Sequence, residues 1–168
     1  MRFVLVVHGE VEGGQDDPPL SQTGRRQAEA LAAELQKQTA NATVLCGPRR
    51  ATQETAALIV VALQAAMPHL RDDLSAPEDE STAALEASQE QAWSLIEAAK
   101  ALFEPDSTLV LVTHDLVVRA LVCRALSMPL DEMHRFSLQP GSMSTIEWRA
   151  QPRERLLITS LNEVCHLE

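Results

Sequence analysis

The chain has 168 residues, of which 45% are hydrophobic and 23% charged, as expected for one globular domain spanning residues 1–168. Its 24 acidic residues outnumber 14 basic ones, and a net charge of −10 argues against nucleic-acid and anionic-membrane partners. No apolar run reaches the roughly 20 residues that span a bilayer, and the N-terminal residues lack a signal-peptide pattern. Three cysteines without C-x-x-C spacing favour a reducing compartment, so we expect a cytoplasmic protein.

Short apolar runs alternate with helical patterns along the chain. In order, we expect a strand at 3–7, a loop at 13–19, a helix to about residue 38, a strand at 43–46, a helix at 51–66, an irregular excursion at 67–80, a helix at 85–103, a strand at 109–113, a helix at 116–126, and strands at 144–148 and 156–159 joined by a polar turn around Pro152. This alternation predicts an α/β domain with a mostly parallel sheet. The near-continuous apolar strands predict helices on both faces of that sheet.

Polar residues follow three of the expected strands. They are the segments 8–10 (HGE), 46–50 (CGPRR) and 113–115 (THD). Because parallel strands end at one edge of a sheet, we expect His8 and His114 to meet there, beside a helix N-terminus that suits an anion. This arrangement predicts phosphoryl chemistry in which one histidine attacks, the other stabilises the transferring group and an acid protonates the leaving oxygen.

Several stretches, in order and over nearly the whole length, resemble one known family. They are "VLVVHGE", "PLSQTGRRQAEALAAEL", "CGPRRATQETAALI", "LVLVTHDLVVRAL", "LQPGSMSTIEW" and "SLNEVCHL". Each match is weak alone, but together they are similar to the histidine phosphatase superfamily, the phosphoglycerate mutase-like proteins. The resemblance implies a three-layer α/β/α sandwich of the phosphoglycerate mutase-like type.

The resemblance also implies roles for individual residues. It makes His8 the phosphoryl-accepting nucleophile and His114 the second pocket histidine. Asp72, with Asp73 beside it, falls where many members place the proton donor. The substrate-binding positions that it implies are Gly9, Glu10 and the backbone N–H of Asp115. It implies no cofactor, and it implies hydrolysis of a phosphomonoester through a phosphohistidine at His8.

Two positions depart from the family pattern. The family's Arg-His-Gly motif has Val7 in place of the arginine, and the arginine three places after the Ser-Pro proline is Ala51. Arginine grips phosphate through a planar, permanently charged fork. The resemblance therefore implies a phosphatase whose activity is weak or lost, with a small phosphorylated molecule or a phosphoprotein as its partner.

Three alternatives remain open at the level of the sequence. Arg50 would serve as a substitute clamp in an active phosphatase, with Arg119 as a weaker candidate. Without the arginines, the two histidines with Glu10 and Asp115 would suit zinc. A non-enzymatic partner-binding module is the third, and a homodimer is compatible with any of them.

Overall fold

The computed structural model describes residues 1–14, 16–39, 41–150 and 153–167. Its helices and strands are, in order, β1 (Arg2–Val7), α1 (Gln22–Gln38), β2 (Thr43–Cys46), α2 (Arg50–Leu63), β3 (His69–Leu70), α3 (Thr82–Leu102), β4 (Thr108–Thr113), α4 (Asp115–Ala125), β5 (Met143–Arg149) and β6 (Arg155–Glu163). Short 3-10 turns lie at Asp72–Leu74, Leu130–Arg135 and Cys165–Leu167. Within these residues, no helix is both long and apolar enough to cross a membrane.

The strands form one six-stranded sheet in the order β3-β2-β4-β1-β5-β6. Strands β3, β2, β4 and β1 pair in parallel, whereas β5 and β6 add antiparallel strands at one side. The expected mostly parallel sheet is confirmed. The antiparallel pair follows from the short connection between β5 and β6, because a parallel pair requires a crossover of a dozen or more residues.

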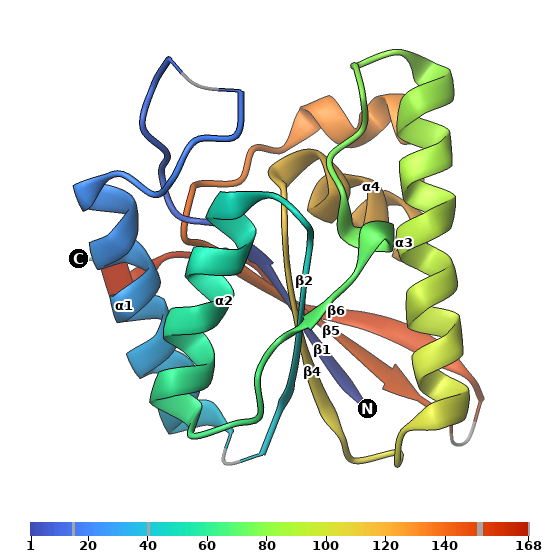
Figure 1. The fold of residues 1–168 in the computed structure, drawn as a ribbon. Helices are drawn as coiled ribbons and strands as arrows, with labels where there is room; N and C mark the ends of the chain where they lie inside the picture. Colours follow the sequence, from blue (N-terminus) through green and yellow to red (C-terminus); the bar gives the residue numbers. More distant parts are fainter. Residues whose placement is uncertain (15, 40, 151–152, 168) are drawn as a thin grey trace.

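Helices cover both faces of this sheet, which gives the three-layer α/β/α sandwich (Figure 1). Along β1, Val4 and Val6 pack in one buried cluster with α1 and α2, and Phe3 and Leu5 pack in another with α3 and α4. This alternation is the two-residue period of a strand whose side chains all enter a core. The fully apolar run in β1 therefore marks a strand buried on both faces.

The segment 67–80 is more ordered than the sequence indicates. Its residues His69–Leu70 form β3, which adds a parallel strand beside β2. The 3-10 turn that follows buries Leu74 completely, and the hydroxyl of Thr113 donates a 2.7 Å hydrogen bond to the Leu74 carbonyl. These contacts are distant in sequence and leave no local pattern. The expected turn around Pro152 lies outside the described residues.

The two central parallel strands continue into helices on opposite faces. Strand β1 leads to α1 on one face, and β4 leads to α4 on the other (Figure 1). In open α/β sheets, such a switch leaves a crevice beyond the carboxyl ends of the strands, where ligands bind. The residues that follow β1 and β4 lie at this position.

Candidate active site

His8 and His114 lie side by side at the carboxyl edge of the sheet. Strands β1 and β4 are paired in parallel with Val7 opposite Thr113, so each histidine is the next residue of its strand. The His8 N–H donates a 3.1 Å hydrogen bond to the Thr113 carbonyl, which extends the ladder by one step. The expected meeting of the two imidazoles is therefore present in the structure.

The two imidazole rings are in direct contact. His8 Nε2 and His114 Nδ1 are 3.2 Å apart, and the rings meet edge-on with centroids 4.9 Å apart. His8 Nδ1 lies 2.8 Å from the Gly9 carbonyl, which can only accept, so Nδ1 carries the proton. His8 Nε2 then holds a lone pair and accepts the Nδ1–H of His114. A histidine held in this tautomer presents its Nε2 as a nucleophile.

Burial keeps both imidazoles neutral. It lowers the pKa of His114 to about 4, with the neighbouring His8 and the Arg49 charge acting in the same direction and Asp115 and Asp17 opposing it. Burial also lowers the pKa of His8, while its hydrogen bond to Gly9 and the charge of Asp115 oppose that shift. At neutral pH the site therefore holds two uncharged rings, and the His114 N–H donates to the His8 Nε2 lone pair when no ligand is bound.

Two glycines let the chain after β1 approach α1 closely. A Cβ placed on Gly24 would lie 1.9 Å from the Glu10 carbonyl oxygen, and one on Gly9 would lie 2.3 Å from the Gly24 oxygen. Backbone atoms cannot retreat as a flexible side chain does, so glycine is required at both places. This contact fixes the segment that carries His8 against the first turn of α1.

The histidines face a cavity of about 230 Å³ at this edge. Its lining comes from the end of β1, the loop before α1, the start of α2 and the start of α4: His8, Val11, Asp16, Asp17, Pro18, Arg49, Ala51 and His114. The loop contributes two carboxylates, which disfavour an anion, and Arg49 contributes a guanidinium, which favours one. The sequence predicts no site role for Asp16, Asp17 or Arg49.

The two positions where the resemblance implies arginine are apolar and buried. Val7 is 4% exposed and packs in the core cluster on the α3–α4 face. Ala51 is also 4% exposed, lines the cavity and packs beside Leu20 and Ala28. Neither position supplies a hydrogen-bond donor to a ligand from its side chain.

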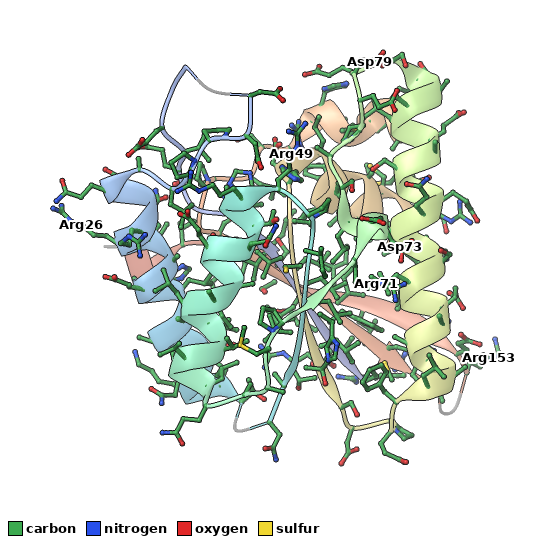
Figure 2. All side chains as sticks on the ribbon, in the orientation of Figure 1. Arg26, Arg49, Arg71, Asp73, Asp79 and Arg153 are labelled. Atoms are coloured by element: carbon green, nitrogen blue, oxygen red, sulfur yellow. The ribbon has the colours of Figure 1, made fainter. Side chains whose placement is uncertain are left out.

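Arg49 and Arg50 take different directions at the start of α2. The Nε of Arg50 donates a 2.8 Å hydrogen bond to Glu54, and this side chain is absent from the described lining of the cavity. Arg49 precedes the helix and lies at the upper edge of the sheet, whereas Arg26 points outward from α1 and Arg153 lies at the opposite end (Figure 2). The expected helix starts at Ala51, but α2 starts at Arg50, and this one-residue shift makes Arg49 the N-cap residue at the rim.

The other site residues expected from the sequence lie beside the cavity or apart from it. Glu10 is exposed, and its carboxylate accepts a 2.8 Å hydrogen bond from the Ser21 hydroxyl. Asp115 pairs with Arg119 one turn further along α4. Asp72 is exposed and lines a separate hollow against α3. The structure thus brings His8, Gly9 and His114 together and leaves the three acids outside the described cavity lining.

The ligand set suggested for zinc does not assemble. Glu10 and Asp115 are directed to other partners, and a metal site needs three or more converging ligands. Across the described parts of the chain, no group of three or more His, Cys, Asp or Glu side chains is placed to hold a metal ion.

Comparison with solved structures shows the same fold in YhfR and in two phosphatases. YhfR from Bacillus stearothermophilus superposes with a TM-score of 0.84 at 18% identity over 99% of each chain. Phosphoserine phosphatase from Entamoeba histolytica, in complex with 3-phosphoglyceric acid, gives 0.82 at 20% identity, also over 99% of each chain. The alpha-ribazole phosphatase from Shigella flexneri gives 0.77 at 22% identity, covering 97% of this chain and 96% of that one.

The comparison with curated proteins finds no match. A family model does match, over residues 3–75 and 67–160, which together include both histidines and the start of α2. With nearly the whole chain matched and the fold shared, this chain belongs to the histidine phosphatase superfamily, branch 1.

Proposed function

We propose that this chain is a slow phosphatase that hydrolyses the phosphomonoester of a small molecule through a phosphohistidine at His8. One observation carries the proposal: the His8–His114 pair faces a cavity whose wall includes Ala51, while Val7, the residue before His8, is buried in the core. Both residues stand where the family pattern implies arginine. The similar structures include a phosphoserine phosphatase and an alpha-ribazole phosphatase, which supports a small phosphorylated substrate.

The tautomer of His8 sets the first step. The His8 Nε2 lone pair attacks phosphorus, a P–N bond forms, and the bond between phosphorus and the leaving oxygen breaks with its electron pair on that oxygen. The leaving oxygen takes its proton from a solvent water molecule, and the water that later attacks the phosphohistidine returns a proton to solvent. The Nδ1–H stays on the Gly9 carbonyl and stabilises the charge that develops on the ring. Water then attacks the phosphohistidine, releasing inorganic phosphate and restoring the lone pair.

Several features make these steps slow. A charged hydrogen bond to phosphate is worth roughly 1.5–3 kcal/mol, and losing one transition-state donor costs about 10²–10³ in rate. Losing two costs on the order of 10⁴, although such effects are not additive. His114 is neutral and gives an N–H but no full charge. Asp72, the acid expected to protonate the leaving oxygen, lies against α3 and not at the cavity.

The test is hydrolysis of p-nitrophenyl phosphate by wild type, His8→Ala, Ala51→Arg and Val7→Arg/Ala51→Arg. We expect wild type to exceed His8→Ala but to stay below about 1 s⁻¹, the low end of enzyme turnover. Ala51→Arg should raise the rate about tenfold or more, because it places a guanidinium at the cavity wall. The double variant should raise it further if it folds, and Ala51→Arg leaves the buried Val7 position intact.

Acid-quenched samples should also contain phosphohistidine in wild type and none in His8→Ala. Equal rates for wild type and His8→Ala, with no phosphohistidine, would overturn the use of His8. A wild-type turnover rate above about 10 s⁻¹, the median for enzymes, would overturn the proposal that this phosphatase is slow.

A further inference from the structure

Arg49 has a rigidly held backbone at the rim of the cavity. It is the N-cap residue of α2, with an extended backbone at φ −69° and ψ 146°. The hydroxyl of the fully buried Thr52 donates to the Arg49 carbonyl at 2.6 Å and also lies 2.7 Å from the Gly47 carbonyl. The origin of the Arg49 side chain is thus fixed relative to the end of β2.

The guanidinium of Arg49 retains donors for a ligand. One of its nitrogens, Nη1, donates a 3.2 Å hydrogen bond to the backbone carbonyl of Asp16 and lies 3.9 Å from the Asp16 carboxylate. A guanidinium has five N–H groups in a planar fork, so most of them stay available. The side chain is 47% exposed and lines the same cavity as His8 and His114.

Other arginines near this edge are engaged elsewhere. Arg25 and Arg50 both lie within ion-pair distance of Glu54, and Arg119 pairs with Asp115. Among the described residues that line the cavity, Arg49 supplies the one guanidinium. Its charge also reaches His114, because it is one of the causes that lower the pKa of that ring.

We propose that Arg49 is the anion-binding residue of this pocket and takes over, from the N-cap position of α2, the phosphate contact that position 51 no longer provides. The proposal rests on the proposed function, since the ligand is the phosphoryl group of the same substrate. An oxyanion would bind the fork of Arg49 on one side and the His114 N–H on the other. The Asp16 carboxylate competes with it for the guanidinium.

The test is calorimetric titration with orthovanadate, a phosphate mimic, at neutral pH. We expect Arg49→Ala to weaken binding at least about tenfold, because a charged, bidentate contact is lost. Arg49→Lys should give an intermediate affinity, since it keeps the charge but not the fork. Arg50→Ala, its neighbour in sequence, and Arg26→Ala, on the outer side of α1, should both stay within about twofold of wild type.

Asp16→Asn should bind vanadate about twofold to fivefold more tightly, the range expected when one exposed ionic competitor is removed. An Arg49→Ala protein that binds as wild type does, or an Arg50→Ala protein that loses as much affinity, would overturn the role of Arg49. Each of these side chains is exposed or half-exposed, and circular dichroism would confirm that the variants fold.

Parallel measurements separate this proposal from the proposed function. If Arg49→Ala weakens vanadate binding but His8→Ala leaves the rate of p-nitrophenyl phosphate hydrolysis unchanged, the anion-binding role of Arg49 stands and the proposed phosphatase reaction is overturned. If His8→Ala abolishes hydrolysis but Arg49→Ala changes neither the hydrolysis rate nor the vanadate affinity, the proposed reaction stands and the anion-binding role of Arg49 is overturned.

Discussion

His114 shows how burial changes the chemistry available to one side chain. Its ring lies beside His8 at the N-terminus of α4, and its pKa falls to about 4 because burial penalises the charged form. A phosphate pocket gains most from positive charge, yet this ring stays neutral across the physiological range. The same shift also affects the stability of the folded protein, since a change in pKa on folding couples stability to pH.

We therefore expect the protein to lose stability as the pH falls through the range where only the unfolded His114 is protonated. The imidazole has a pKa of 6.5 ordinarily and about 4 when folded, so below 6.5 protons favour the unfolded chain until about pH 4. His114 alone should lower the free energy of unfolding by about 2 kcal/mol between pH 7 and pH 5. Urea unfolding at the two pH values measures this loss.

His114→Gln is the control, since it removes the titrating group and should show a smaller loss over the same pH interval. If wild type and His114→Gln lose the same stability, the ring is not buried as a neutral group.

Helix α1 makes a close backbone contact with the segment that carries His8. Its first turn meets the segment after β1 through the backbone of Gly24, which lies against the Glu10 carbonyl. A methyl group at position 24 would force α1 away from the segment that carries His8. Overpacking of this kind costs typically 1–3 kcal/mol, and backbone cannot relax as a side chain does.

We expect Gly24→Ala to lower the free energy of unfolding by about 3 kcal/mol, measured by urea denaturation. Gly13→Ala is the matched control, because a Cβ there meets no atom within 4 Å. That variant should stay within about 0.5 kcal/mol of wild type. Equal effects at the two positions would contradict the close contact between α1 and the site.

The sequence predicts the elements with strong local patterns and misses contacts made at a distance. The apolar runs of β1, β2 and β4 predict the sheet, and their ends place the two histidines, because parallel strands finish at one edge. Strand β3 was missed because two exposed residues carry no period. The sequence does not single out Arg49, because the direction of its side chain depends on where α2 begins. The helix starts at Arg50 and not at the expected Ala51, so Arg49 becomes the N-cap residue at the rim of the cavity.

The whole molecule carries a charge of −10 around a pocket whose described lining has one guanidinium and two carboxylates. An anion approaching from solvent therefore meets a repulsive long-range field before it meets Arg49. Added salt screens that field, since the Debye length falls from about 30 Å at 10 mM to about 8 Å at 150 mM. The local contact with the fork, at short range, is screened less.

We expect the association rate constant for inorganic phosphate to rise about twofold or more over that range of salt, measured from 31P NMR line shapes. In Arg49→Ala the association rate constant should rise with salt by the same factor, although this variant binds phosphate more weakly at every salt concentration. A rate that falls with salt would mean that the guanidinium, and not the net charge, dominates the approach.

The hydrogen bond between the two imidazoles runs in one direction, because the His114 N–H donates and the His8 lone pair accepts. Without a ligand, this lone pair is therefore occupied and less available for attack. The other ring nitrogen of His114, Nε2, is buried with no hydrogen-bond partner among the described residues. In the proposed reaction, an incoming oxyanion would offer the His114 N–H a charged acceptor in place of His8, so we expect substrate binding to release the His8 lone pair for attack.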